Sequence, residues 1–524
     1  MDIISRGELG YRLTQSYSRL ESNRYLPEVI WSADKNCWYG DWEGRTILAL
    51  VALAGATKKE PSYLEEILDM LPQKLNAQGY IGEIYPDAEI SEQQLAGNSW
   101  LLRGLIEYTY LTGSDRCRPI IEGMVRNLYL PILDAVREYP IEEYEEEGNY
   151  SGSIIAKRGR WLLSSDIGCV FISMDGISAA YELLGWNELR VLLEGMIERY
   201  EKVAFYEARY QTHATLSALR GILRTYRLTG KAEYLELVRR VYALYLKKGT
   251  TETHANTTRF QVPTWTEPCA IVDSYMIAVE LYAATGECAY LETAQEIYLN
   301  AISHAQLPNG GMGLENCVGH EGQEFLTFLK KKTGAITEAY WCCSMRGADG
   351  LSYVSRNQCK KQDGAYHLIH FFDAVMKDGA TEITIKTKYP YEGRVFLSVK
   401  DDGKTVVRLF MPRCMKNIRV NGAASALEGQ WLTLRAEGEA EFLVEFDIPL
   451  VVKDAAYGAK KLYHGLMLLG CPDENDLLPV LQYAGGGKYL AEDGRCFSSV
   501  GRTVFKDEAS VTAERLQVLF RPKR

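Results

Sequence analysis

Three cysteines and one glutamate in the second half of the chain have the side chains and the spacing of a metal site. Glu267 and Cys269 lie two residues apart in the sequence Thr-Glu-Pro-Cys, and Cys342 and Cys343 are adjacent in the sequence Trp-Cys-Cys-Ser. Thiolates and carboxylates are both ligands of zinc in proteins, and four of them complete a tetrahedral shell. We therefore treat these four side chains as a candidate zinc site.

The sequence around Glu267 and Cys269 predicts a helix that begins at this pair. Pro268 precedes a strongly apolar stretch, residues 270–284, and proline is favoured in the first turn of a helix. Free N–H groups and the helix dipole at such a terminus lower the pKa of a thiol and favour the thiolate. The alternative for this pair is a buried cysteine beside a capping glutamate, and for the adjacent cysteines it is two ordinary buried thiols. The joint pattern, Glu-x-Cys followed by Cys-Cys, is more specific than either half.

Helices are the elements that must position these residues. From about residue 46 to residue 307, apolar residues recur with helical periodicity in paired segments, joined by short turns that carry glycine. Recurring helical hairpins of this size predict a solenoid or its closed relative, an (α/α)-barrel. Irregular spacing between the hairpins favours the closed form, in which the loops at one end of the helices form a pocket. The glycines that we expect to end helices are Gly113, Gly185, Gly230 and Gly286.

After about residue 358 the pattern changes to short runs with alternating apolar residues, separated by turn sequences such as Asp-Asp-Gly-Lys at residues 401–404. This pattern predicts a β-sandwich. We expect an (α/α)-barrel catalytic domain over residues 1–360, a β-sandwich over 361–455, and a further β-rich and loop-rich segment over 456–524 that packs on the sandwich. The expected strands are residues 366–372, 382–388, 394–400, 406–411, 418–420, 431–434, 441–446, 465–469 and 516–520.

Composition and charge exclude some classes of function. The 524-residue chain has a formal net charge of −10 and no basic block, which argues against nucleic acid or an anionic membrane as the main partner. Its 34 tyrosines and 9 tryptophans suit a carbohydrate cleft, where aromatic rings stack on sugars, and equally suit a protein core. The N-terminus lacks the apolar core of a signal peptide, no apolar run is long enough to span a bilayer, and twelve cysteines lack the spacing of a disulfide framework. We therefore expect a cytoplasmic protein with reduced thiols.

Two stretches, Thr-Glu-Pro-Cys-Ala and Tyr-Trp-Cys-Cys-Ser-Met-Arg, resemble glycoside hydrolase family 127, the β-L-arabinofuranosidase-like proteins. The corresponding stretches of that family read Glu-x-Cys-Ala and Cys-Cys. The resemblance runs over nearly the whole chain, is weakest near the C-terminus, and implies an (α/α)₆ barrel followed by β-sandwich domains. Further stretches that agree lie at residues 40–45, 77–82, 212–214 and 462–469.

This resemblance implies a role for each member of the candidate zinc site. Glu267, Cys269, Cys342 and Cys343 would bind zinc, and Cys342 would also be the nucleophile. Zinc keeps a thiolate deprotonated at neutral pH, and a thiolate is a strong nucleophile. Attack at an anomeric carbon would give a glycosyl thioether that water resolves with net retention, so the thiolate replaces the usual nucleophilic carboxylate.

The family also uses a glutamate as general acid/base, about sixteen residues before the zinc-binding glutamate. Here Glu252 lies fifteen residues before Glu267 and is the candidate, with His254 as its local competitor. His213 matches a family histidine in the sugar pocket. The alternatives are an exposed loop carboxylate for Glu252 and a hydrogen-bonded helix histidine for His213.

The chain departs from the family pattern at positions that would face the sugar. Tyr340 stands where the family often has histidine, and Asn98 follows Gly97 where a Gly-His pair is common. Changing a buried hydrogen-bonding partner shifts specificity strongly, so we expect a sugar that differs from plain β-L-arabinofuranose. The candidate substrate-binding residues are Trp42, Glu43, Tyr80, Asn98, His213, His254 and Tyr340.

The sequence thus predicts a zinc-dependent, retaining, exo-acting glycoside hydrolase that acts on a β-L-arabinofuranoside or a related sugar. One alternative is an (α/α)-barrel polysaccharide lyase or unsaturated-uronide hydrolase, which the scarcity of histidine disfavours: the chain has only seven. Another is a non-catalytic sugar-binding protein with structural zinc, which a closed shell of three cysteines and one glutamate would suit. We expect a small oligosaccharide or glycoside as partner, no nucleic acid and no membrane, and we keep a homodimer as one option for assembly.

Overall fold

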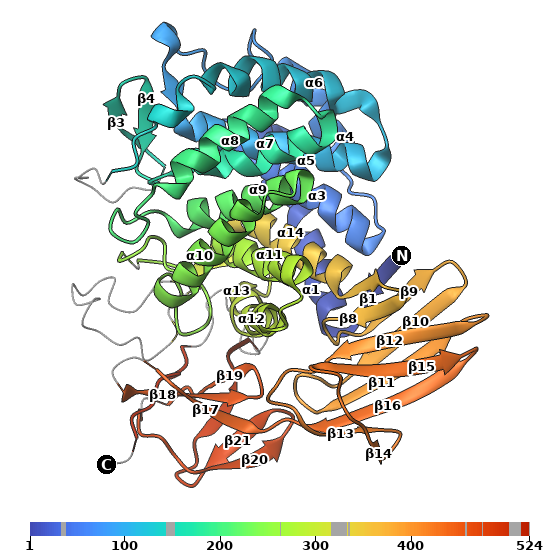
Figure 1. Cartoon of the computed structure of the whole chain (residues 1–524). Coiled ribbons are helices and arrows are strands. Elements are labelled where there is room, and N and C mark those ends of the chain that lie inside the picture. Colours follow the sequence, from blue (N-terminus) through green and yellow to red (C-terminus); the bar gives the residue numbers. More distant parts are fainter. Residues whose placement is uncertain are drawn as a thin grey trace.

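A computed structural model describes residues 1–32, 38–142, 152–262, 264–315, 333, 336–455, 458–473, 475–501 and 515–522. Within these residues, helices dominate up to residue 357 and strands dominate after it. The helical part and the strand part lie against each other (Figure 1). No helix in the described part of the chain combines the length and the apolar character needed to cross a membrane.

Six helices of the helical part contact one another in a closed cycle, in which each helix touches the next and the last touches the first. Their side chains are buried over most of their circumference, as expected for helices that are apolar on nearly all faces. Gly44 and Gly104 allow two of them to approach closely, because a Cβ at Gly44 would lie 2.0 Å from the backbone nitrogen of Leu101. The six helices are α3 (Asp41–Thr57), α5 (Glu92–Thr112), α7 (Ser173–Leu184), α9 (Thr212–Thr229), α11 (Pro268–Thr285) and α14 (Cys343–Asn357).

Other helices alternate with these six along the chain and bury a single face. In α10, for example, Tyr234, Leu237, Val238 and Val241 are buried at helical spacing, and the opposite side is polar. These helices are α1 (Gly7–Leu20), α2 (Pro27–Ser32), α4 (Leu64–Met70), α6 (Arg118–Met124), α8 (Asn187–Glu201), α10 (Ala232–Lys248), α12 (Ala289–Ile297) and α13 (Ser303–Ala305).

Glycine ends four of the six helices of the cycle, as the sequence predicts. The N–H of each glycine donates a hydrogen bond to the carbonyl four residues earlier, and its φ lies between +69° and +73°. A residue without a Cβ adopts this left-handed conformation at little cost, and the helix therefore stops there. These positions are Gly113, Gly185, Gly230 and Gly286.

Two sheets of the strand part share one hydrophobic core. Ile383 and Leu397 from one sheet and Leu409 and Leu434 from the other belong to the same buried cluster. The seven-stranded antiparallel sheet has the order β1 (Asp2–Ser5), β9 (Ala374–Asp378), β10 (Thr381–Thr387), β11 (Arg394–Lys400), β16 (Ala440–Asp447), β13 (Lys416–Val420) and β14 (Ala423–Ala424). The four-stranded sheet has the order β15 (Trp431–Glu437), β12 (Lys404–Phe410), β8 (Ala365–Leu368) and β7 (Cys359–Gln362), with β8 and β12 parallel.

A third large sheet packs against the helical part. Asn300 joins the two, because its Nδ2 donates to the Leu466 carbonyl and its Oδ1 accepts from the Leu468 N–H. The strands in order are β17 (Leu450–Asp454), β18 (Lys460–His464), β19 (Met467–Gly470), β22 (Cys496–Ser499), β21 (Lys488–Ala491) and β20 (Leu481–Gly485). Two small sheets lie in the loops of the helical part: β2 (Ile90–Ser91), β4 (Trp161–Ser164) and β3 (Ile154–Arg158), and β5 (Gly313–Glu315) with β6 (Ile336–Glu338).

Most expected strands are present, and the differences have local causes. The strand expected at 394–400 has those bounds, whereas the one expected at 366–372 ends at Leu368. Residues 516–520 make only isolated bridges, to Lys460 and Cys471, so they are not a continuous strand. Strand β1 comes from the N-terminus, outside the region where strands are expected, and pairs with β9 along its whole length.

Candidate active site

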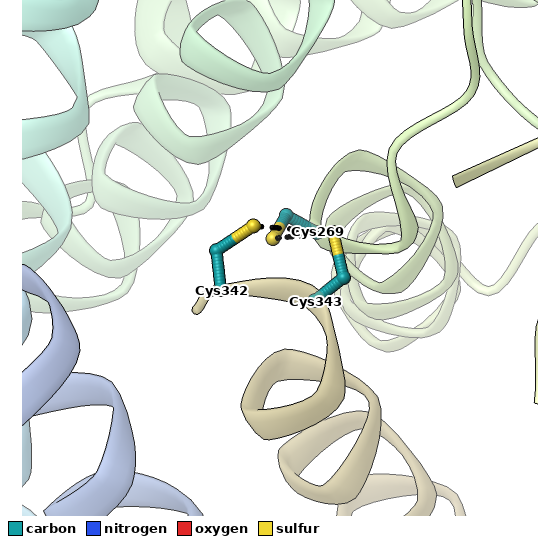
Figure 2. Close-up of side chains that lie close together, drawn as sticks. All are labelled: Cys269, Cys342 and Cys343. Atoms are coloured by element: carbon teal, nitrogen blue, oxygen red, sulfur yellow. Dashed lines mark hydrogen bonds between the residues drawn. The ribbon is translucent and has the colours of Figure 1, made fainter. Parts of the chain in front are cut away.

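Cys269, Cys342 and Cys343 lie together where two helices of the cycle begin (Figure 2). Pro268 is the first residue of α11 and Cys269 the second, as the sequence predicts. Cys342 immediately precedes α14 and Cys343 opens it. The positive dipole end of each helix lies at these cysteines, which favours negative charge there.

The spacing of the sulfur atoms suits a single metal ion. The Sγ atoms of Cys269 and Cys343 are 3.8 Å apart, those of Cys342 and Cys343 are 3.3 Å apart, and all three lie within 4.8 Å of one another. Zinc–sulfur bonds of about 2.3 Å in a tetrahedron place two sulfurs about 3.8 Å apart. In the described part of the chain, this is the group of cysteine, histidine and carboxylate side chains that meets the criterion for a metal site.

Glu267 lies in the same cavity but outside the compact group of three sulfurs. It is the residue before α11, and its Oε2 is fully buried with no hydrogen-bond partner among the described residues. Burial, together with the nearby charges of Asp166 and Cys269, raises the pKa of Glu267 well above its usual value, although a hydrogen bond with the Trp265 side chain opposes this. A buried carboxylate oxygen without a hydrogen-bond partner is suited to binding a cation.

The three thiols differ in acidity. Burial opposes ionisation of Cys269, but hydrogen bonds with Cys342 and Cys343 and the nearby Arg45 guanidinium outweigh it and lower the pKa of Cys269. The hydrogen bond with Cys269 is the largest cause that raises the pKa of Cys342, and burial is the largest cause for Cys343. The first negative charge in the cluster therefore settles on Cys269.

Arg45 stabilises that charge from the first turns of α3. Its Nη1 donates to the Cys269 sulfur at 3.4 Å, and its Nε donates to both carboxylate oxygens of Asp41 at 2.9 Å. The guanidinium lies over the Trp100 ring, 4.1 Å from the centroid, and the Arg346 guanidinium lies 4.7 Å from the same centroid. The thiols thus rest above a buried layer of arginine and tryptophan.

His213, from the first turn of α9, completes that layer and lines the cavity. Its ring stacks on Trp100 with centroids 6.0 Å apart, and its Nε2 lies 3.7 Å from the Asp273 carboxylate. Burial lowers the pKa of His213 to about 4. The imidazole is therefore neutral at neutral pH and can both donate and accept hydrogen bonds.

The cavity that holds these groups has a volume of about 470 Å³. Its polar side chains come from the starts of the helices and from the loops before them, and its apolar surface comes chiefly from aromatic rings. A pocket of this size with a few converging polar groups is typical of small-ligand sites. The polar and charged lining residues are Asp41, Arg45, Asp166, Gln211, His213, Glu267, Cys269 and Cys342, and the aromatic ones are Trp38, Trp42, Trp265, Tyr340 and Trp341.

The expected acid/base Glu252 and its competitor His254 lie elsewhere, against β18 of the third large sheet. Glu252 is close enough to Lys461 and Tyr463 to act on the pKa of both. The His254 Nε2 is 3.0 Å from the Tyr463 hydroxyl, and desolvation lowers the pKa of His254 to about 4. Neither side chain lines the cavity of the thiols. Backbone reversals explain the difference, because the loop that carries them includes residues with positive φ, among them His254 at 62°.

Three expected substrate-binding residues also lie outside the cavity, whereas Trp42, His213 and Tyr340 line it. The Asn98 side chain is fully buried and binds backbone groups: its Nδ2 donates to the carbonyls of residues 39, 81 and 94, and its Oδ1 accepts from the N–H of Ile81. Tyr80 lines a separate surface cavity and bonds to Gln78. Glu43 is buried on another side of α3.

Arg45 and Asp41 line the cavity although neither is among the expected site residues, and the same holds for the tryptophans at positions 38, 265 and 341. A signal for the first two exists, since residues four apart on a helix face the same way and an Asp-Arg pair at that spacing forms an ion pair. Trp42 lies beside them on this face, and Glu43 does not. The tryptophans have no comparable signal, because an aromatic residue in a loop suits a core equally well.

The chain resembles known proteins in fold and not in sequence. No protein-family model and no curated protein matches the chain. A family 127 β-L-arabinofuranosidase from Geobacillus stearothermophilus T6 is 11% identical, with a TM-score of 0.69 and coverage of 100% of both chains. The chain has the fold of that enzyme.

Two further solved structures agree over the whole length. A family 127 β-arabinofuranosidase is 11% identical, with a TM-score of 0.67 and coverage of 98% of this chain and 92% of the other. A structure described as a glycoside hydrolase is 14% identical, with a TM-score of 0.66 and coverage of 100% and 97%. The resemblance at the level of fold therefore spans both the helical part and the strand part.

Proposed function

We propose that the chain is a retaining, exo-acting glycoside hydrolase in which Cys342 is the nucleophile. The observation that carries this proposal is the gathering of three thiols at two helix N-termini in a cavity of about 470 Å³. The fold shared with β-L-arabinofuranosidases supports a furanoside as substrate. Neither support depends on the other, since one comes from side chains and the other from the backbone.

We also propose a finer description of the fold. The closed cycle of six helices would be the inner ring of an (α/α)₆ barrel, with the alternating helices outside it. The two sheets that share one core would form a β-sandwich. The domain limits at residues 360 and 455 remain proposals, with β1 as an N-terminal strand added to the sandwich.

Zinc fits the donor groups of the cavity. Cys269, Cys342, Cys343 and Glu267 would hold it, and the fit rests on the sulfur spacing and on the buried, unpartnered Oε2 of Glu267. Bound zinc would keep Cys342 ionised at neutral pH. The ten cysteines in the described part of the chain are free thiols, which supports a reducing, cytoplasmic setting.

The proposed reaction has two displacements at the anomeric carbon. The Cys342 sulfur attacks the anomeric carbon while the bond between that carbon and the glycosidic oxygen breaks. A carboxylic acid gives its proton to the departing oxygen. The same group, now a carboxylate, takes a proton from water as the water oxygen attacks the anomeric carbon and the carbon–sulfur bond breaks. Two inversions give net retention, with Cys342 restored.

The proton must come from a group inside the cavity. Glu252 stays a prediction, but its place beside Lys461 leads us to propose Asp166 for this role. Of the other carboxylates that line the cavity, Asp41 is paired with Arg45 and Glu267 is a proposed metal ligand. Asp166 lines the cavity and is 5% exposed, and its backbone N–H donates to the Ser164 hydroxyl.

Rescue of activity by azide tests whether Asp166 or Glu252 is the acid/base. Asp166→Asn and Glu252→Gln are assayed on a glycoside whose leaving group departs without protonation, such as a dinitrophenyl glycoside, with and without sodium azide. We expect Asp166→Asn to lose activity and to regain turnover as the glycosyl azide of retained configuration, because azide needs no base. Rescue of Glu252→Gln, with Asp166→Asn unaffected, would return the role to Glu252.

The proposed hydrolase is tested with a panel of nitrophenyl furanosides and pyranosides. We expect about one zinc per chain and hydrolysis of at least one β-L-furanoside. A furanose epoxide inactivator followed by peptide mapping should label Cys342. A chain that holds zinc, binds sugars and hydrolyses no member of the panel would instead be a sugar-binding protein with a structural metal, an alternative that the position of Glu252 outside the cavity favours.

A further inference from the structure

The aromatic side chains around the thiol cavity are unusual in being partly exposed. Trp341 is 46% exposed, whereas Trp100 at the floor of the site is 1% exposed. Exposing a large ring costs apolar burial, so a group of partly exposed rings at one cavity indicates a binding surface. The five aromatic lining residues are Trp38, Trp42, Trp265, Tyr340 and Trp341.

Three of these rings form one rigid unit, which we call the aromatic rim: Trp42, Tyr340 and Trp341. The Tyr340 ring centroid is 5.1 Å from that of Trp341, at 87°, and 5.9 Å from that of Trp42. The Arg24 guanidinium lies 4.2 Å from the Tyr340 centroid, and the Tyr25 hydroxyl donates to the Tyr340 carbonyl at 2.7 Å. The rim is therefore set before any ligand binds, which lowers the entropic cost of binding.

The lining of the cavity has an aromatic part, which includes the rim, and a polar part. Charged and hydrogen-bonding side chains such as Arg45, His213 and Asp166 provide partners for the hydroxyls of one sugar ring. Trp341 lines the same cavity as Cys342 and is the most exposed residue of its lining. When the sugar ring occupies the buried polar part, a group attached through its anomeric oxygen extends toward the exposed part of the lining, where Trp341 lies.

We propose that the aromatic rim is a subsite for the leaving group, and that it selects leaving groups with a broad apolar ring face. Both an aromatic aglycone and a pyranose with axial C–H groups have such a face, and both stack on indole rings. This inference rests on the proposed hydrolase function. Small or open-chain leaving groups make no comparable contact with the rim.

The test keeps the sugar constant and varies the leaving group. The sugar that the nitrophenyl panel identifies is prepared as its phenyl glycoside, as a disaccharide with a pyranose leaving group, and as its glycosyl fluoride, whose leaving group has no ring. We expect Trp341→Ala to lower kcat/KM about tenfold or more on the ring substrates and to leave the fluoride unchanged. Trp341→Phe, which keeps a ring, should recover most of the loss.

The arms also distinguish the two kinds of ring. A loss confined to the phenyl glycoside assigns the rim to aromatic aglycones, and a loss confined to the disaccharide assigns it to sugars. The matched control is Tyr110→Ala, an aromatic residue that is 50% exposed at the far end of α5 and should change neither substrate class. An equal loss on the fluoride and the ring substrates, or no loss on any, overturns the proposal.

A binding measurement makes the test independent of turnover. Calorimetric titration with the phenyl and the methyl thioglycoside of the same sugar, which resist hydrolysis, should show tighter binding of the phenyl compound by about tenfold in the wild-type protein, and equal binding in Trp341→Ala. Equal binding of both compounds by the wild-type protein overturns the subsite. If no glycoside is hydrolysed, the hydrolase proposal fails and the titration alone decides the subsite.

Discussion

Helices of the six-helix cycle line two cavities, one at each end of the cycle. The buried charges near the two cavities are compensated differently. The first turns of α3, α9, α11 and α14 line the thiol cavity, and later turns of the same helices line a second cavity of about 320 Å³. Seven to eleven residues separate Cys269 from Met276 and Glu280 along α11, or about 10–17 Å of helix. Each helix therefore contributes to two sites with different charge arrangements.

Arginines that line the second cavity neutralise a buried carboxylate in the first turn of α7, that of Asp175. Asp175 lies 2.7 Å from Arg224, 3.2 Å from Arg103 and 3.5 Å from Arg220. Burial opposes ionisation of Asp175, but the three arginines outweigh it and lower its pKa. Asp175 and the three arginines form a buried ionic network that links α5, α7 and α9.

Two other buried carboxylates, those of Glu92 and Glu267, have raised pKa values instead. Burial raises the pKa of Glu92 to about 7, although its carboxylate accepts hydrogen bonds from Tyr139, Ser164 and Val170. Burial likewise raises the pKa of Glu267. Groups held in a costly state without a compensating charge are typical of functional sites. The difference assigns chemistry to the starts of α11 and α14 and stability to the arginine network around Asp175, and four substitutions test it.

Cys342→Ala should have the largest effect. We expect kcat/KM to fall at least about a thousandfold, because loss of a nucleophile removes the covalent route, while the urea midpoint of the metal-free protein changes little. Steady-state kinetics and unfolding curves measure both. Cys414→Ala, a partly exposed cysteine in the strand part, is the matched control and should leave both unchanged. Full activity in Cys342→Ala would contradict the assignment of chemistry to the helix starts.

Asp175→Asn should affect stability instead. Removing the charge leaves three buried arginines without their common partner, and breaking such a network costs about 3–5 kcal/mol of unfolding free energy. Urea titration measures it, and kcat of the folded fraction should stay near the wild-type value. Because the folded-state pKa of Asp175 is lowered, this stabilisation is present above the unfolded value of about 3.9 and is lost as the pH falls below it.

An exposed ion pair provides the control for Asp175. Asp115 lies 3.9 Å from Arg118, with 82% of its side chain exposed. Asp115→Asn should cost less than about 1 kcal/mol, because surface pairs are screened by solvent. A similar cost for both variants, or a loss of kcat in Asp175→Asn, would remove the distinction between the two ends.

Glu92→Gln tests the raised pKa at the helix starts. The protonated Glu92 stabilises the fold fully below the unfolded pKa of about 4.3, and this contribution is lost as the pH rises through about 7. Glutamine does not titrate, so the stability gap between wild type and variant should shrink by about 3 kcal/mol from pH 4 to pH 8. Unfolding free energies at a series of pH values measure the gap. A constant gap would mean that Glu92 is ionised throughout, and the exposed Glu188→Gln serves as control.

Local signals in the sequence predicted much of the fold. The glycines that end α5 and α9, the proline that opens α11, and the alternating residues of β11 each act within one or two turns of chain, where the physical rule is local. The cluster of Cys269 with Cys342 and Cys343 also followed, because few arrangements bring such a pattern together without a metal. Strand β1 did not, since its partner β9 lies more than 350 residues away.

The rest of the site depends on tertiary structure that spacing does not encode. The offset between Glu252 and Glu267 matched an expected position, but the intervening loop turns back at residues with positive φ and carries Glu252 to β18. Asn98 reads as a ligand-binding amide, yet three backbone carbonyls take up its donors. In both cases the residue type suggested a functional role, but the sequence did not predict where the side chain would lie.

Substitution of Arg45 should have the smallest effect of the four, and it tests a single interaction, the hydrogen bond to Cys269. Three thiolates and one carboxylate around a divalent ion leave an excess of two negative charges in a buried place, and Arg45 is the cation whose hydrogen bond reaches Cys269. Arg45→Met should therefore weaken zinc binding about 10–100-fold, as changes beside metal ligands do. Competition with a chromogenic chelator measures zinc affinity without any assay of activity.

Charge and geometry can be separated at the same position. Arg45→Lys keeps the cation but not the paired contacts to Asp41 and the Trp100 ring, so it should recover part of the lost zinc affinity. Arg24→Met removes an exposed arginine near the cavity that touches Tyr340 but no thiol, and it should bind zinc as the wild type does. If Arg45→Met bound zinc as tightly as the wild type, the helix N-termini alone would stabilise the negative charge of the site. The helix starts would then differ from the later turns by their dipoles and not by a dedicated arginine.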